Sequence, residues 1–561
     1  MGLSYIFYSR LGTWAALAAV LLTPAAAMAQ YNVSTLLLEG TPIPGSTNLW
    51  QLNAGQVPGQ PLSISGNYVA FVQCAGGSSC GPTYPTDGIW VENLSTKTFT
   101  HLVAPGAVAP ETGGLTFTTF GGYALVAGGR VIFLGTAGGK SGYYSVPVTG
   151  SPISVIANQN TILPGLATTG TYSFGNSTSD LPQSDGTHVV FQAASTAGLS
   201  VYLADLNGQG LTELAGPNTP LEIAGSNCGS ANTGFAQPRV SGSNVEFDSP
   251  SFFNNYLYLA GVTGVPLGPQ CSPNGYIEFN PILQYNTPLP GEPSTVQFEY
   301  ASLTAIDNLH VYFTGAGNGS NGVYQMNFDG SGLAAVLNST ESVPGITPPF
   351  SSVGGLGAAK GTVIFNVAAV ENQTTSVGGL FAYQNNEIVR IAGTGDILAG
   401  LPGNSWLPSV GPNSISGGQV VFLFGNPGQI GVFLAGAATC AADVTSHVKM
   451  TQTPPRLNPS TGDYNSKVTI QNISGQTMAA PVSVVFDGLV NATVVGAPQP
   501  PELLNKGSGA TTCLSPLGEA YLVVNGGAAL APGASTGVEL NIADATGTPG
   551  FSTRVVSGTP R

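Results

Sequence analysis

Three short sequence patterns recur seven times each along this chain of 561 residues, always in the same order. The first is a hydrophobic strand that ends in Phe, at YVAF (68–71), RVIF (130–133), HVVF (188–191), NVEF (244–247), HVYF (310–313), TVIF (362–365) and QVVF (419–422). Successive terminal Phe residues are 52 to 66 positions apart. A period of this length marks a repeat architecture, in which each unit buries its faces against its neighbours.

The two other patterns divide each repeat further. One is a β-branched or aromatic strand, at GIWV (88–91), GYYSV (142–146), SVYLA (200–204), YLYLA (256–260), GVYQM (322–326), GLFAY (379–383) and GVFLA (431–435). The other is a turn, at TPIPG (41–45), GAVAP (106–110), TILPG (161–165), LEIAG (221–225), TPLPG (287–291), ESVPG (341–345) and DILAG (396–400). Many short strands between Gly- and Pro-rich turns predict an all-β protein.

One repeat shows how many strands each unit contains. In residues 361–400, GTVIFNVAAV, GGLFAYQ and NEIVRIAG are three strands, and TGDILAG turns the chain towards the next unit. A further strand after that turn gives four strands in each unit, which is typical of a propeller blade. Seven such units predict a seven-bladed β-propeller.

The order of the patterns also predicts how the ring closes. The chain begins with an outer-type strand, VSTLLL (33–38), and leaves the repeats after GVFLA (431–435), before any outer strand. The last unit therefore lacks the element with which the first begins. We expect the N-terminal strand to complete the seventh blade.

An aromatic residue follows each turn. Two of them, Trp50 and Trp406, could stack on a sugar, but a feature that recurs in every blade is more typical of packing, because aromatic side chains dominate core burial. We therefore expect a packing role for the whole set, which is Trp50, Phe117, Tyr172, Phe235, Phe298, Phe350 and Trp406.

Two repeats resemble a known family. GVYQMNFDGSGLAAVL (322–337) and SVYLADLNGQGLTELA (200–215) are similar to the repeats of TolB-type and WD-like propellers, with a strand, an Asp-Gly or Asn-Gly turn and a strand ending near Leu. Both dipeptides tolerate the positive φ of a tight turn. Such repeats occur in peptidases, in lyases and in binding proteins without catalytic activity, so the resemblance implies a fold and little about function.

The pattern changes at Cys440. Residues 440–561 contain alternating strands at a spacing of roughly ten to twenty residues, which is typical of a β-sandwich. This stretch resembles the small Ig-like domains at the C-termini of secreted bacterial proteins, in which the LAPG-x-S turn recurs. The resemblance implies a spacer or adhesion module. We expect a propeller over residues 30–437 and an Ig-like β-sandwich over residues 438–561.

The first 29 residues have the pattern of a Sec-type signal peptide. Arg10 precedes the apolar stretch TWAALAAVLL, and an A-x-A site at 27–29 predicts cleavage after Ala29 and a mature start at Gln30. No later segment approaches 18 consecutive apolar residues, so we expect no membrane span. The mature protein is predicted to be secreted or periplasmic.

Six cysteines fit an oxidising compartment and structural disulfides. Six allow fifteen pairings, so the sequence does not fix the connectivity. None shows C-x-x-C spacing, which argues against zinc or redox chemistry. Proximity in the chain suggests the pairs Cys74–Cys80, Cys228–Cys271 and Cys440–Cys513.

Composition and motifs exclude several functions. The chain has only 13 Lys and Arg and a net charge of −14, which argues against nucleic acid as a partner. The four histidines, His101, His188, His310 and His447, show no metal-ligand spacing. His188 and His310 occupy the same variable strand-entry position of the repeat, for which we expect a structural role. The stretch Asp205-Leu206-Asn207-Gly208 has two of the ligands of a calcium loop and then stops, so it predicts a turn. We expect no metal and no cofactor.

No catalytic constellation emerges from the sequence. No G-x-S-x-G opens a helix, and no α/β-hydrolase domain follows the repeats, as a TolB-like peptidase would require. A glycosidase would need two converging carboxylates. Four acids of the fourth and fifth repeats are candidates, although we expect solvated loop acids: Glu246, Asp248, Glu299 and Asp307.

The predicted function is therefore non-catalytic binding of a glycan or another protein at the propeller face, because a propeller offers a wide face built from loops around a channel. We expect the protein to be a monomer. One alternative is a polysaccharide lyase or glycoside hydrolase on the same scaffold. A second alternative is a structural component of the cell surface or matrix.

Overall fold

The computed structural model describes most of the chain after residue 29. The described residues are 30–558 without 45–48, 53–61, 75–85, 167–171, 175–180, 218, 223–227, 231–234, 250–255, 263–280, 284–286, 348, 373–374, 400, 403–407, 427–428, 439, 492–500, 506 and 544–548. Within this part, no helix is long and apolar enough to cross a membrane.

The structure confirms a seven-bladed β-propeller, in which each blade is one antiparallel sheet. Blade 1 contains β2 (Ser63–Ser65), β3 (Tyr68–Cys74), β4 (Thr86–Asn93) and β5 (Thr98–Val103). Blade 2 contains β6 (Phe117–Ala127), β7 (Arg130–Ala137), β8 (Lys140–Pro147) and β9 (Ser154–Asn158). Blade 3 contains β10 (Tyr172–Phe174), β11 (Gln183–Ser184), β12 (His188–Ser195), β13 (Gly198–Asp205) and β14 (Thr212–Ala215). In blade 3, β10 and β11 pair with opposite ends of β12 and together form the innermost strand.

The remaining blades repeat this order. Blade 4 contains β17 (Ala236–Ser241), β18 (Asn244–Ser249), β19 (Tyr256–Gly261) and β20 (Pro281–Leu283). Blade 5 contains β21 (Tyr300–Ile306), β22 (His310–Gly317), β23 (Ser320–Asn327) and β24 (Ala334–Leu337). Blade 6 contains β25 (Phe350–Ala359), β26 (Thr362–Asn372), β27 (Thr375–Gln384) and β28 (Glu387–Gly393). Two short ribbons lie between blades: β15 (Pro220–Glu222) with β16 (Cys228–Ser230), and β29 (Ile397–Leu398) with β30 (Leu401–Pro402).

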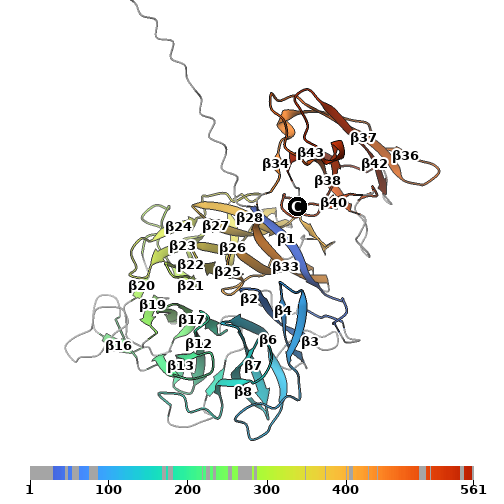
Figure 1. Cartoon of the computed structure of the whole chain (residues 1–561). Helices are drawn as coiled ribbons and strands as arrows, with labels where there is room; N and C mark the ends of the chain where they lie inside the picture. Colours follow the sequence, from blue (N-terminus) through green and yellow to red (C-terminus); the bar gives the residue numbers. More distant parts are fainter. Residues whose placement is uncertain are drawn as a thin grey trace, which may run out of the picture.

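Blade 7 joins the two ends of the repeat region, as the sequence predicts. It contains β31 (Ile415–Ser416), β32 (Gln419–Asn426), β33 (Gln429–Ala438) and, as its outer strand, β1 (Gln30–Leu38). β1 runs antiparallel to β33, from Gln30 opposite Ala438 to Leu38 opposite Gly431. The N-terminal strand therefore closes the ring, and the blue β1 lies beside the orange β33 (Figure 1).

The first two sequence patterns meet inside every blade. In each sheet the Phe of the second strand lies directly opposite an aromatic residue of the third, in the pairs Phe71–Trp90, Phe133–Tyr144, Phe191–Tyr202, Phe247–Tyr258, Phe313–Tyr324, Phe365–Phe381 and Phe422–Phe433. All fourteen side chains are buried. Cross-strand aromatic pairs stabilise a sheet beyond the burial of their area, which explains why this spacing recurs.

The aromatic residues after the turns pack against these pairs. Trp50 makes edge contacts with Phe71 and Trp90, with both centroid distances at 5.1 Å. Phe117 contacts Tyr144 in the same way at 4.9 Å. Six of the seven are buried, with exposures of at most 5%, so the packing prediction is confirmed for Trp50, Phe117, Tyr172, Phe235, Phe298 and Phe350. Trp406 lies outside the described residues.

A second unit follows the ring. It is one ten-stranded sheet assembled from β34 (Ala442–Asp443), β35 (Val448–Gln452), β36 (Arg456–Leu457), β37 (Tyr464–Asn472), β38 (Val482–Asn491), β39 (Glu502–Leu503), β40 (Gly509–Ala510), β41 (Glu519–Val524), β42 (Ser535–Ala543) and β43 (Ser552–Ser557), with the short 3-10 turns η1 (Thr445–His447) and η2 (Asn525–Gly527). Its core contains alternating residues of β37, β38, β41 and β42. An Ig-like topology remains a prediction.

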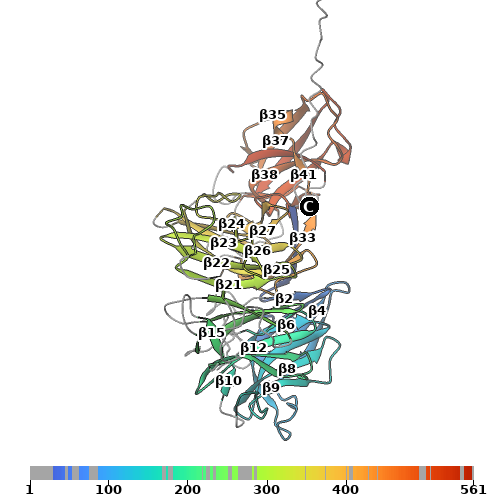
Figure 2. The same ribbon diagram turned by 90° about the vertical axis from the view of Figure 1, so that its left-hand side faces the viewer.

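The C-terminal unit lies against blades 6 and 7, while blades 2 and 3 lie at the far side of the ring in both views (Figures 1 and 2). Cys440, just after β33, and Cys513 form a disulfide with Cα atoms 5.7 Å apart. Cys74 ends β3 and Cys228 begins β16, but their side chains are not among the described ones, and Cys80 and Cys271 lie outside the described residues. Those two pairings remain predictions.

Candidate functional site

A polar cavity of about 440 Å³ lies where the inner ends of the blades meet. In each blade the innermost strand turns sharply into the second strand, and these turns surround the cavity. All seven blades contribute, through Ser65, Ala127, Asp185, Arg239, Asn308, Lys360 and Ser416 among others. No aromatic side chain lines this cavity in the described part of the chain. A ligand would therefore be recognised mainly by hydrogen bonds and charge.

A side-chain hydrogen bond crosses the axis beside this cavity. The Asn413 Nδ2 group, from the segment before β31 in blade 7, donates to Gln183 Oε1 on β11 in blade 3. Blades 3 and 7 are not neighbours in a ring of seven, so this bond spans the channel. Asn413 is also held by its own carbonyl, which accepts the Ile64 N–H at 2.9 Å. The bond therefore joins two non-adjacent blades at the cavity that they both line.

Two aspartates that line the cavity are occupied by the turns themselves. Asp307 Oδ1 accepts the N–H groups of Leu309 and His310 at 2.8 and 2.9 Å, and its Oδ2 accepts the N–H of Gly361 in the next blade at 2.6 Å. Asp185 holds the equivalent turn of blade 3, where Oδ1 accepts the N–H of His188 at 2.8 Å. Both carboxylates are therefore structural caps, and that of Asp307 also links blades 5 and 6.

Lys360 differs from these aspartates. It lines the same cavity from the turn after β25, it is exposed, and its φ is +50°. Its ammonium has no hydrogen-bond or ion-pair partner among the described residues. Lys360 is thus a cationic donor on the cavity wall that is available to a ligand.

The second cation, Arg239, belongs to a buried charged cluster. Arg239 on β17 lies opposite Glu246 on β18, and Asp248 lies two residues further along β18. Their exposures are 5%, 0% and 8%. Burial lowers the pKa of Arg239 against the raising effect of the two acids. Burial raises the pKa of Asp248 to about 7, although Arg239 opposes this shift. One acid of the cluster therefore titrates near neutral pH.

The expectation of solvated loop acids is wrong for three of the four candidates. Glu246, Asp248 and Asp307 are buried in the sheet or in a turn. Asp307 accepts three backbone N–H groups, and Arg239 is a buried cation near the two acids of β18. Glu299 is exposed, and its Oε1 accepts the N–H of Asn318 at 3.1 Å. Only Asp307 lines the axial cavity. The four acids do not converge on one accessible cleft.

The structure does not bring the histidines together either. His101, His188 and His310 belong to blades 1, 3 and 5, and His447 belongs to the C-terminal unit. His101 stacks on Trp90, and His188 Nδ1 lies 3.2 Å from Asp185 Oδ2. No group of three potential metal ligands occurs in the part of the chain that the structure describes.

The predicted turn at residues 205–208 is present. Asp205 Oδ1 accepts the N–H groups of Asn207 and Gln209, both at 2.8 Å, and Gly208 has a φ of +82°. The carboxylate thus caps a turn, which accounts for the partial calcium-loop pattern.

Sequence reasoning missed the axial cavity and the cross-axis bond. Lys360, Asn413 and Gln183 follow no motif, and each is an ordinary polar residue near a Gly turn. One signal was visible for the buried cluster. Glu246 occupies a position that is apolar or aromatic in the six other repeats, namely Ala70, Ile132, Val190, Tyr312, Ile364 and Val421.

The chain matches no protein-family model and no curated protein. Similar solved structures include prolyl endopeptidases (TM-score 0.38, 9% identity, 80% of this chain and 56% of theirs) and the β-propeller domain of the Trilobed protease from Pyrococcus furiosus (0.36, 11%, 67% and 94%). TolB from Acinetobacter baumannii is also similar (0.29, 11%, 58% and 64%). At this identity no activity is transferred to the chain, which spans under two thirds of the prolyl endopeptidases and of TolB.

Proposed function

We propose that this protein is an exported, non-catalytic binding protein whose ligand, a glycan or another protein, binds at the axial cavity of the propeller. The observation that carries this proposal is the cavity itself, which all seven blades line and to which six of them contribute polar side chains. A concave site with a few converging polar groups is the ordinary form of a binding site.

The chemistry of the wall supports binding more than catalysis. The aspartates of the wall cap turns, Arg239 is matched by two buried acids, and Lys360 is left as an available donor. A nucleophile or general acid–base pair would need a second reactive group within hydrogen-bond reach. Asp185 on the wall has His188 Nδ1 at 3.2 Å, but its carboxylate also caps the turn, and His188 does not line the cavity. A polysaccharide-active enzyme and a structural surface component remain the alternatives.

Export is part of the proposal. The N-terminal pattern of residues 1–29 supports it, and the disulfide between Cys440 and Cys513 is of the kind that persists in oxidising compartments. We propose that the mature chain begins at Gln30, the first residue of the closing strand β1.

The test is a binding screen of the mature protein against immobilised polysaccharides, oligosaccharides and peptides, which follows both retention and the release of reducing sugar over a day. For any retained probe, Lys360→Gln is expected to weaken binding about ten-fold, because a hydrogen bond to a charged group is lost. Lys97→Gln is the matched control, since Lys97 is also an exposed turn lysine with positive φ (+56°) but does not line the cavity.

Three outcomes decide between the alternatives. Retention without release, with a loss in Lys360→Gln but not in Lys97→Gln, supports the proposal. Release of reducing sugar would establish an enzyme instead. Retention that is equally strong in both variants would place the ligand elsewhere on the protein.

A further inference from the structure

One loop of the C-terminal unit reaches into the propeller. Residues 511–518 connect β40 to β41, and their ends are held together by Thr511 N–H to Glu519 O at 2.9 Å and Gly518 N–H to Thr511 O at 2.7 Å. We call these residues the docking loop. Because its base is closed by its own hydrogen bonds, the loop presents a defined shape to the ring.

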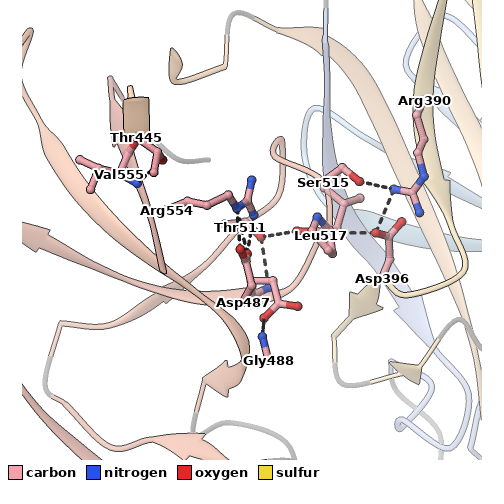
Figure 3. A network of polar contacts seen from close by, with 12 residues as sticks. Arg390, Asp396, Thr445, Asp487, Gly488, Thr511, Ser515, Leu517, Arg554 and Val555 are labelled. Atoms are coloured by element: carbon pink, nitrogen blue, oxygen red, sulfur yellow. Dashed lines mark hydrogen bonds and ion pairs between the residues drawn. The ribbon is translucent and has the colours of Figure 1, made fainter. Parts of the chain in front are cut away.

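The docking loop forms four hydrogen bonds with blades 6 and 7, and Figure 3 shows those that join Leu517 to Asp396 and Ser515 to Arg390. Leu517 takes part in two of them: its N–H donates to Asp396 Oδ1, and its carbonyl oxygen accepts the N–H of Ile397, both at 2.8 Å. Arg390 Nη1 donates to Ser515 Oγ at 2.8 Å, and Val33 N–H on the closing strand β1 donates to Thr512 O at 2.8 Å. The loop therefore contacts the strand that closes the ring.

The side chain of Leu517 is buried in the propeller. It is 3% exposed and belongs to the same apolar cluster as Tyr31 and Val33 of β1. The next residue, Gly518, has a φ of +88°, and a Cβ there would lie 1.8 Å from Ile397 O. Only glycine permits this approach of the two backbones. The fit of the loop is thus specific at both positions.

Asp396 shows how one blade turn is adapted to the loop. In several turns, a side-chain oxygen accepts the backbone N–H of the residue three positions earlier. Thr161 Oγ1, for example, accepts the N–H of Asn158 at 3.0 Å. Asp396 keeps this role, with Oδ2 accepting the Gly393 N–H at 2.6 Å. A carboxylate has a second oxygen, and Oδ1 is the atom that accepts Leu517 N–H and the Arg390 guanidinium at 3.0 Å.

The disulfide tethers this loop to the end of the ring. Cys513 lies within the docking loop, and Cys440 lies two residues beyond Ala438, the residue of β33 that pairs with Gln30. The covalent bond therefore fixes the loop next to the strand pair that closes the propeller.

We propose that the C-terminal unit functions as the lock of the propeller: its docking loop, secured by the Cys440–Cys513 disulfide, holds β1 on β33 and so keeps the ring closed. The role is independent of which ligand the axial cavity binds.

Hydrogen exchange of the whole mature protein tests the lock, because local opening of one strand pair is measured separately from global unfolding. The comparison uses two leucines of the docking loop. Leu517→Ala removes the side chain that enters the ring, whereas Leu514→Ala removes one that packs within the C-terminal unit. We expect amides of β1 to exchange at least ten-fold faster in Leu517→Ala and to be nearly unchanged in Leu514→Ala.

A second measurement needs no substitution. Mild reduction of the disulfide in the wild-type protein is expected to raise exchange in β1 and β33, while β6 and β7 of blade 2 keep their protection. The proposal is overturned if β1 keeps its protection both in Leu517→Ala and after reduction. It is also overturned if blade 2 loses protection to the same extent as β1.

Discussion

Blades 2 and 4 place different chemistry at the same positions of the repeat. In blade 2, Leu125 lies opposite Ile132, and Leu134 follows two residues later. In blade 4, these positions are Arg239, Glu246 and Asp248. All six side chains are at least 92% buried. The aromatic pair between the second and third strands is nevertheless the same in both blades.

This difference shows that the blade requires burial and volume at these positions, and that it accepts charge when the charges are matched. Isolated charges in such a site would cost several kcal/mol in lost hydration. A guanidinium between two carboxylates offsets part of that cost. Blade 4 is therefore expected to be the blade most sensitive to pH and to loss of a single partner.

The largest expected effect comes from breaking the cluster at its cation. Arg239→Ala leaves Glu246 and Asp248 buried without their counter-charge, and we expect a loss of about 3–5 kcal/mol in the free energy of unfolding. Urea unfolding of the mature protein, followed by fluorescence, measures this. A loss below about 1 kcal/mol would mean that the cluster is hydrated in solution.

The matched change in blade 2 should cost somewhat less. Leu125, the counterpart of Arg239, is buried among apolar side chains, so Leu125→Ala removes apolar burial and leaves a cavity. We expect a loss of about 2–4 kcal/mol, by the same unfolding measurement. Unlike the effect of Arg239→Ala, this loss should be the same at pH 5 and pH 8, because no titratable group is involved.

Asp248→Asn should remove the pH dependence of stability that distinguishes blade 4 from blade 2. The pKa of Asp248 is raised to about 7 in the folded protein from its usual value of 3.8, so the folded state retains a proton that the unfolded state releases. The stability contributed by this group is full below pH 3.8 and is lost as the pH rises through about 7. We expect wild type to lose about 2 kcal/mol between pH 5 and pH 7 relative to Asp248→Asn. Parallel pH profiles of the two proteins would contradict the assignment.

The smallest change is expected from exchanging the whole cluster. The triple variant Arg239→Leu, Glu246→Ile and Asp248→Leu gives blade 4 the residues of blade 2. Replacing a buried ionic cluster by apolar residues of similar volume is often neutral or stabilising, so we expect a gain of about 1 kcal/mol at most. Thermal unfolding at pH 7 measures it, and a loss of more than about 2 kcal/mol would show that the charges have a structural role that apolar packing cannot replace.

The sequence predicts the blades well because their chemistry is local and repeated. The Phe of one strand and the aromatic residue of the next are 11 to 19 residues apart, and this spacing recurs seven times. The closure by β1 follows from the order of the patterns alone. Boundaries of the regular strands are thus largely readable from residues 30–438.

The site is less predictable, because its contacts join distant residues. Asn413 and Gln183 are 230 positions apart, and Leu517 and Asp396 are 121 positions apart. Neither pair belongs to a sequence motif, because the role of an amide or a leucine side chain is apparent only when the fold brings its partner near. The sequence predicts solvated loop acids in blade 4, because the burial of Glu246 and Asp248 depends on Arg239, which the sequence does not place beside them.

The closing strand has a consequence for how the protein folds. Ser34 on β1 lies opposite Leu434 on β33, and the two residues are 400 positions apart. The strand that is synthesised first is therefore paired only when nearly the whole ring exists. Such non-local pairing slows folding, because the entropy of closing a long loop must be overcome first. Until then β1 and β33 leave open strand edges, which other chains could pair with. Refolding yield is therefore expected to fall steeply with protein concentration, and aggregates should form through blade 7.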